Sequence, residues 1–144
     1  MSQDNVEKLR SLIAPWDGRD LRAFGKAWGS GDVDLSLLDA EVAYEDTILP
    51  DHVGETYHGQ EGVARAMERW TEPYGQLITE LQRIVGDRDT LVSIHRVRSR
   101  AGHTGIGFDF PIAYLWRFRD GKVIVLRSYR SPEEALAAAG LADG

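Results

Sequence analysis

Apolar residues recur at helical spacing in the first half of the chain. They fall three or four positions apart between residues 4 and 14, and again between residues 17 and 28. A third such pattern follows Gly59, with apolar and charged residues on opposite faces. Residues 131–134 form a capping box, in which a serine precedes a proline and two glutamates. These patterns predict helices that each pack one face against another layer.

The second half of the chain is typical of β-strands. The long runs of strand-forming residues are residues 77–85, 90–100, 106–118 and 122–130. Short turns containing glycine separate them, a briefer run at residues 42–46 precedes them, and residues 50–59 are predicted to form a loop. Helices followed by a meander of strands predict an α+β fold, in which one curved antiparallel sheet wraps around a helical layer.

The alternation of side chains along two strands indicates which polar residues face inward. The three arginines within residues 90–100 share one face, which is therefore predicted to contact solvent. The opposite face carries His95, the histidine best placed for an interior position. In the first strand, the same alternation puts Asp46 on one face with Val42 and Tyr44, so we expect this face to be buried and the carboxylate of Asp46 to lie at its inner end.

The last two strands are apolar on both faces. Residues 108–118 carry aromatic residues on one face and a mixture on the other. A sheet of this kind usually meets a second layer or a partner chain on its far side, so we expect a homodimer. In residues 122–130, Ser128 shares a face with apolar residues, but the opposite face is also half apolar, and both orientations stay open.

Length and composition restrict the class of function. The chain has 144 residues, 42% of them hydrophobic and 28% charged, which predicts a single domain over residues 1–144. Because it has no cysteine, thiol nucleophiles and cysteine-ligated zinc are excluded. A net charge of −6 argues against a nucleic-acid partner. Without an apolar run of membrane-spanning length, we expect no membrane association and a cytoplasmic location.

Two further patterns predict no site. Asp51, His52, Glu55 and His58 are close in sequence but lack the helical spacing of a metal-ligating motif, so we expect no metal. The glycines between the later strands do not match a phosphate-binding loop. We therefore expect no cofactor.

Several short motifs occur in an order that resembles a known family. The motifs are Tyr44-Glu45-Asp46, residues 57–63, residues 116–123, residues 129–136 and Gly140-Leu141. Together they resemble the SnoaL-like branch of the nuclear transport factor 2 superfamily over residues 21–141. The resemblance implies a cystatin-like α+β barrel, a cone-shaped bent antiparallel sheet wrapped around three helices with a central pocket. It also implies dimerisation through the outer face of the sheet.

The resemblance also implies candidate catalytic residues. The family includes ketosteroid isomerases, polyketide cyclases, scytalone dehydratase and limonene epoxide hydrolase, together with members of no known activity. Asp46 looks like the general base of the isomerases. Phe24 stands near the position of their tyrosine donor, and because it has no hydroxyl it argues against steroid isomerisation. Asp109 lies near the position of their second, carboxylic acid donor.

Two hypotheses follow for the function. In the first, a cofactor-free isomerase, cyclase, dehydratase or hydrolase uses Asp46 as general base on a small apolar substrate, while His95 donates a hydrogen bond. Asp109 or Tyr44 would be a further donor. The substrate-binding residues would be Tyr44, Phe24, Trp28, Tyr57, Trp70 and Ser128. In the second hypothesis, the same domain only holds a hydrophobic ligand or dimerises.

The same residues also have structural interpretations. Asp46 would then be a solvated residue at a strand end, and His95 would be a core histidine bonded to a neighbour. Asp109 would lie at an exposed edge of its strand. The aromatic residues would form the hydrophobic core and bind nothing.

Overall fold

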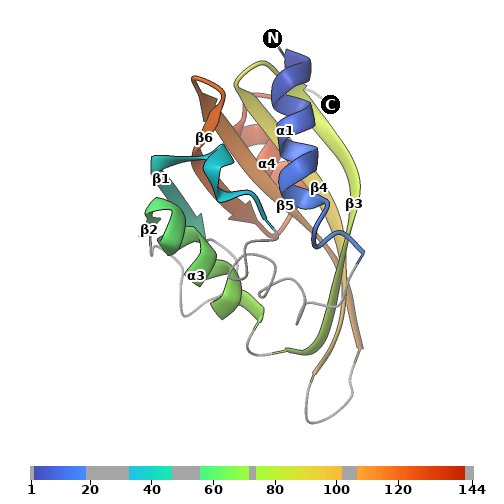
Figure 1. The fold of residues 1–144 in the computed structure, drawn as a ribbon. Coiled ribbons are helices and arrows are strands. Elements are labelled where there is room, and N and C mark those ends of the chain that lie inside the picture. Colours follow the sequence, from blue (N-terminus) through green and yellow to red (C-terminus); the bar gives the residue numbers. More distant parts are fainter. Residues whose placement is uncertain (1, 19–32, 47–55, 72–73, 102–106, 142–144) are drawn as a thin grey trace.

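A computed structural model describes residues 2–18, 33–46, 56–71, 74–101 and 107–141 of the chain (Figure 1). The helical elements in this part are α1 (Ser2–Ile13), the 3-10 helix η1 (Leu35–Leu37), α3 (Gly59–Thr71) and α4 (Pro132–Ala138). The strands are β1 (Leu38–Asp46), β2 (Thr56–His58), β3 (Tyr74–Asp87), β4 (Thr90–Ala101), β5 (Gly107–Arg119) and β6 (Lys122–Tyr129). The predicted α+β fold class is confirmed.

The six strands form one curved sheet in the order β2-β1-β6-β5-β4-β3 (Figure 1). Strands β3 to β6 form the predicted antiparallel meander. The expectation of a wholly antiparallel sheet is wrong, because β1 pairs parallel to β6. The prediction of a loop over residues 50–59 is wrong in part, since β2 pairs with β1 there. Both corrections concern pairings between distant segments, which the local alternation of residues does not encode.

Helices cover both faces of the sheet (Figure 1). α1 and α3 lie on one face, which we call the inner face, and their buried residues share one hydrophobic cluster with Tyr114 and Trp116. α4 lies on the opposite, outer face, where Ala135 packs with Ile94 and other residues of β4 and β5. None of the described helices combines the length and apolar character needed to cross a membrane.

The predicted turn and the predicted helix cap are present on either side of β6. Ser131 is the N-cap of α4, where its Oγ accepts a hydrogen bond of 3.1 Å from the backbone N–H of Glu134. In the turn between β5 and β6, Asp120 and Gly121 have φ angles of 53° and 78°. These left-handed conformations suit a tight hairpin whose twist matches that of its strands.

Candidate functional site on the inner face

The backbone register brings four polar residues into one row across the sheet. Asp46 of β1 lies opposite Ser128 of β6. Tyr114 of β5 lies opposite both Ser128 and Ser93 of β4. We call Asp46, Ser128, Tyr114 and Ser93 the polar row. Asp46 belongs to it through its backbone position, while its side chain lies outside the described residues.

Hydrogen bonds link this row to the neighbouring aromatic residues. The hydroxyl of Tyr44 donates to Ser128 Oγ at 3.2 Å, and both side chains are buried. Trp116 Nε1 donates to Ser93 Oγ at 2.8 Å, again in the interior. The inward orientation of Tyr44 agrees with its predicted face, and the orientation of Ser128, left open by the sequence, is also inward.

His95 lies beside the row and is completely enclosed. It is 0% exposed, and its Nε2 is 2.8 Å from Ser93 Oγ, two residues earlier on the same face of β4. Its ring stacks on Trp16 and meets the edge of Tyr114, with 5.4 Å between ring centroids in each pair. Its Nδ1 has no hydrogen-bond partner among the described residues. His95 is therefore held in one place but leaves one nitrogen for another group.

Burial decides the charge of this histidine. Enclosure among apolar rings removes water from the imidazole and lowers the pKa of His95 to about 3. The imidazole is therefore neutral near pH 7. A neutral imidazole carries one N–H donor and one nitrogen acceptor, so His95 can direct a hydrogen bond but does not supply a positive charge.

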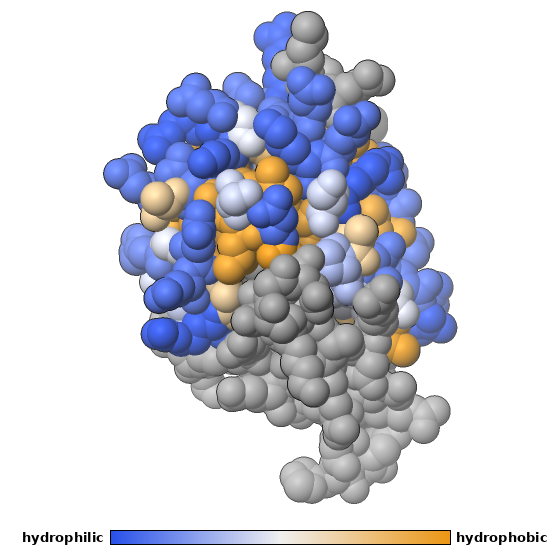
Figure 2. Space-filling view, in the orientation of Figure 1, coloured by the Kyte–Doolittle hydropathy of each residue, from blue (hydrophilic) through white to orange (hydrophobic). Residues whose placement is uncertain are grey.

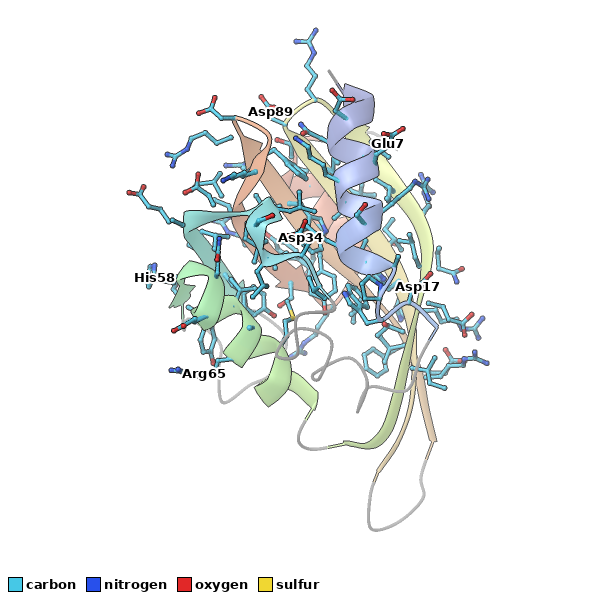
Figure 3. The ribbon with its side chains drawn as sticks, in the orientation of Figure 1. Glu7, Asp17, Asp34, His58, Arg65 and Asp89 are labelled. Carbon is cyan, nitrogen blue, oxygen red and sulfur yellow. The ribbon has the colours of Figure 1, made fainter. Side chains whose placement is uncertain are left out.

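Short polar contacts hold Trp16 over His95. The indole Nε1 of Trp16 donates to the carbonyl of Leu12 at 2.8 Å. Asp17, the next residue, accepts a hydrogen bond of 2.7 Å from the backbone N–H of Leu81, so it lies against the edge strand β3 (Figure 3). The backbone N–H of Gly18 donates to the carbonyl of Thr79 at 2.7 Å. The turn that follows α1 thus covers this part of the inner face.

Asp109 is placed differently from His95. Its carboxylate forms a two-point ion pair with Arg96, with distances of 2.8 Å to Nε and 2.6 Å to Nη2. The side chain is 48% exposed, and the hydrogen bond to the Arg96 guanidinium lowers the pKa of Asp109. Such a carboxylate is ionised near neutral pH, so it lacks the proton that a second donor beside His95 would need.

The other predicted site residues fall into two groups. Tyr57 is half-buried and stacks on Tyr44, with their ring centroids 6.0 Å apart. Phe24 and Trp28 lie outside the described residues, as does the side chain of Trp70. Among the described side chains, the structure thus brings Tyr44, Ser128 and His95 together on the inner face.

Sequence reasoning did not select the residues that connect His95 to the row. Ser93 bridges His95 and Trp116, while Trp16 and Tyr114 pack against the imidazole. The alternation of β4 places Ser93 beside His95, and this signal could have identified it. The roles of Trp16 and Tyr114 depend on long-range packing, for which the sequence offers no local signal.

The structure describes two surface hollows away from the polar row. One of about 380 Å³ lies at β3, β4 and β5 and is lined by Gln82, Ile94, His95, Arg96, Asp109, Phe110 and Pro111. Because His95 is 0% exposed, the accessible wall of this hollow comes from the other residues. The second hollow, of about 340 Å³, lies at the start of α3 and includes His58, which points away from the sheet (Figure 3). In contrast, apolar residues gather in a band across the middle of the side on which α1 and α3 lie (Figure 2).

This fold is found in many solved structures of the nuclear transport factor 2-like and ketosteroid isomerase-like class. Residues 21–126 match the family model of the SnoaL-like domain, and the chain belongs to this family. The predicted family and the cone fold are therefore confirmed. No protein with a curated description matches the chain.

Three of the similar structures indicate the range of the class. A ketosteroid isomerase-like protein from Catenulispora acidiphila, in complex with trimethylamine, is 22% identical, with a TM-score of 0.63 and 96% of each chain covered. A putative SnoaL-like polyketide cyclase from Jannaschia sp. CCS1 is 18% identical, with a TM-score of 0.67 and coverage of 99% of this chain and 94% of that one. An epoxide hydrolase of the limonene epoxide hydrolase-like type from M. tuberculosis is 13% identical, with a TM-score of 0.61 and coverage of 98% and 95%. At these identities the similarity shows the fold.

Proposed function

We propose that this protein binds a small, mostly apolar molecule against the inner face of its sheet and transforms it by acid/base chemistry without a cofactor. The observation that carries this proposal is His95, a fully buried imidazole whose Nδ1 has no hydrogen-bond partner among the described residues. Buried polar groups are almost always paired, and exceptions in native proteins are often functional. A ligand with one polar group would pair this nitrogen.

Asp46 is the proposed general base. Its backbone lies at the end of β1, opposite Ser128, whose hydroxyl is bonded to Tyr44. A carboxylate at this end of the polar row would remove a proton next to a carbonyl group, or from a water molecule. His95 would donate a hydrogen bond to the oxygen on which negative charge develops. This division of roles fits an isomerase, cyclase, dehydratase or hydrolase.

A second candidate function is non-catalytic binding of the same kind of ligand. Asp109 favours it, because the carboxyl proposed as second donor is ion-paired to Arg96 and half exposed. In this alternative His95 fixes the orientation of the ligand and Asp46 remains an ordinary solvated carboxylate. The two candidates therefore differ in the pKa of Asp46.

Titration of the carboxyl carbons by NMR separates the two candidates. A general base in a poorly solvated interior should have a pKa above about 4, the usual value for aspartate. Asp109 is an internal control in the same spectra, since its pair with Arg96 lowers its pKa. Asp46→Asn assigns the signal. A pKa of about 4 for Asp46 would contradict the catalytic role and leave ligand binding alone.

The homodimer and the cytoplasmic location stay predictions. We infer that the dimer would form through the outer face, because β5 presents the exposed Pro111 there beside the Arg96–Asp109 pair. Pro111→Asp would place a charge in this surface. Sedimentation should show a dimer for the unmodified chain and a monomer for the variant, whereas a monomer for both would contradict the inference.

A further inference from the structure

The hydrogen bonds of Ser93 favour one of the two neutral tautomers of His95. The indole nitrogen of Trp116 is only a donor, so Ser93 Oγ accepts its hydrogen bond. The remaining partner of Ser93 among the described residues is His95 Nε2, at 2.8 Å. If Nε2 carried the proton, Ser93 would accept twice and its own buried hydroxyl proton would have no acceptor. If Ser93 donates to Nε2, the indole N–H, the Ser93 hydroxyl and Nε2 are all paired, and the imidazole proton is on Nδ1. Only this Nδ1–H then lacks a described partner, whereas the other tautomer leaves both the Ser93 hydroxyl proton and Nδ1 without one.

The second observation is a buried hydroxyl on the adjacent strand. Thr79 is 1% exposed, and its Oγ1 has no hydrogen-bond partner among the described residues. In the register of β3 and β4, Thr79 lies opposite Val97 and Leu81 lies opposite His95. Thr79 is therefore a diagonal neighbour of His95 on the inner face. His95 Nδ1 on β4, which carries a proton in the favoured tautomer, and Thr79 Oγ1 on β3 thus both lack a described partner and lie on neighbouring strands.

The buried groups around His95 Nδ1 and Thr79 Oγ1 determine which charge a ligand group could carry if it bonded to both atoms. The described buried side chains with polar groups belong to Asn5, Thr79, Ser93, His95, Ser128 and several tyrosines and tryptophans, and none of these is charged when His95 is neutral. A carboxylate placed among them would lose its hydration without gaining a cation. A carbonyl oxygen needs only donors, which Nδ1–H and a threonine hydroxyl supply.

We propose that His95 Nδ1–H and the Thr79 hydroxyl form an anchor for a neutral acceptor oxygen, such as the carbonyl of a ketone, aldehyde or ester. Ser93 is a positioning residue in this anchor, because it acts through the tautomer of His95. The anchor rests on the proposed function and adds one point to it, the kind of polar group that the ligand carries. The hydrocarbon remainder of the ligand would contact the aromatic rings around His95.

The tautomer is tested first, in the ligand-free protein. Long-range ¹H–¹⁵N correlation spectra at pH 7 distinguish the protonated from the unprotonated imidazole nitrogen, and His95→Gln assigns the signals. We expect the proton on Nδ1 in the unmodified chain and in Trp116→Phe, which keeps the Ser93–His95 bond. Ser93→Ala should give a mixture of the two tautomers. A proton fixed on Nε2 in the unmodified chain would overturn the anchor and, with it, the donor role of His95, and would leave only the binding of a small apolar molecule from the proposed function.

Ligand class is tested with four probes of similar size, namely acetophenone, 1-phenylethanol, benzoate and ethylbenzene. Acetophenone should bind about tenfold more tightly than ethylbenzene, the effect of one net hydrogen bond, and benzoate should bind most weakly. Acetophenone, and less strongly 1-phenylethanol, should shift the His95 Nδ1 proton because their oxygens accept a hydrogen bond, whereas ethylbenzene should not. Thr79→Val should reduce the preference for the ketone and leave ethylbenzene binding unchanged.

The outcomes separate the anchor from the proposed function. Equal affinity for acetophenone and ethylbenzene would overturn the anchor while supporting an apolar binding site. Tighter binding of benzoate than of acetophenone would also overturn it, since it would require a buried cation. Failure of all four probes, ethylbenzene included, would contradict the proposed small-molecule site itself, and the anchor with it.

Discussion

Two buried hydroxyl groups on the inner face should respond to removal in opposite ways. Ser93 and Thr79 are both almost completely buried, but Ser93 Oγ has two hydrogen-bond partners and Thr79 Oγ1 has none among the described residues. Ser93→Ala leaves Trp116 Nε1 and His95 Nε2 buried and unpaired. Since each of these two unpaired buried groups costs about 1–3 kcal/mol, the free energy of unfolding should fall by about 2–6 kcal/mol.

Thr79→Val should have the reverse effect. Valine keeps the shape of threonine and replaces a hydroxyl that has no described partner by a methyl group. Removal of an unsatisfied polar group from the interior is favourable, so the free energy of unfolding should rise by about 1 kcal/mol in the absence of ligand. If the proposed anchor exists, this gain is the stability that the protein gives up to keep the Thr79 hydroxyl available.

Urea unfolding followed by tryptophan fluorescence and circular dichroism measures both changes. Thr56→Val, on the exposed side of β2, is the matched control and should change stability by less than about 0.5 kcal/mol. A double-mutant cycle of Ser93→Ala with Trp116→Phe isolates the energy of their hydrogen bond. The reasoning is refuted if Ser93→Ala has the stability of the unmodified chain, or if Thr79→Val is clearly destabilising.

Three further predictions concern pH, a turn and a cap. Because burial lowers the pKa of His95 to about 3, while the unfolded imidazole keeps about 6.5, the unfolded state binds a proton first as the pH falls. The contribution of His95 to stability should be constant above about pH 6.5 and should fall by about 1.4 kcal/mol per pH unit between about pH 6.5 and about 3. His95→Phe should remove that slope in urea titrations at pH 7 and 5. Gly86→Ala should lower the free energy of unfolding by about 2–4 kcal/mol, since φ is +109° and the new Cβ would lie 2.5 Å from the carbonyl oxygen of Thr90. The control Gly18→Ala, at φ +71° with no described atom within 4 Å of the new Cβ, should lower it by about 1 kcal/mol in the same assay. Ser131→Ala should lower the thermal midpoint through a loss of about 1 kcal/mol at the N-cap of α4.

Local patterns predicted those parts of the fold that depend on neighbouring residues. The alternation of β4 placed His95 inside and Arg96 outside, and the capping box placed the start of α4 at Ser131. The parallel pairing of β1 with β6 was missed, because Asp46 and Ser128 meet only after the intervening chain has folded. A period of two assigns faces within a strand but leaves the choice of partner strand open.

The candidate site was predictable only in outline. Asp109 was selected through a resemblance in position, whereas its pairing with Arg96 depends on the register between β4 and β5. The role of His95 turns on which groups surround its two nitrogens, and these groups come from distant segments, including Trp16 beyond α1. Burial of a histidine can be inferred from alternation, but a nitrogen left without a partner is a property of three-dimensional packing.

The most direct test of the central claim is the location of bound acetophenone by intermolecular nuclear Overhauser effects. The inner-face site predicts effects from the ligand to the rings of Trp16, Tyr114 and His95, which Trp16→Leu should weaken. Effects confined to Ile94 and Pro111, at the hollow on the other side of β4 and β5, would contradict the account.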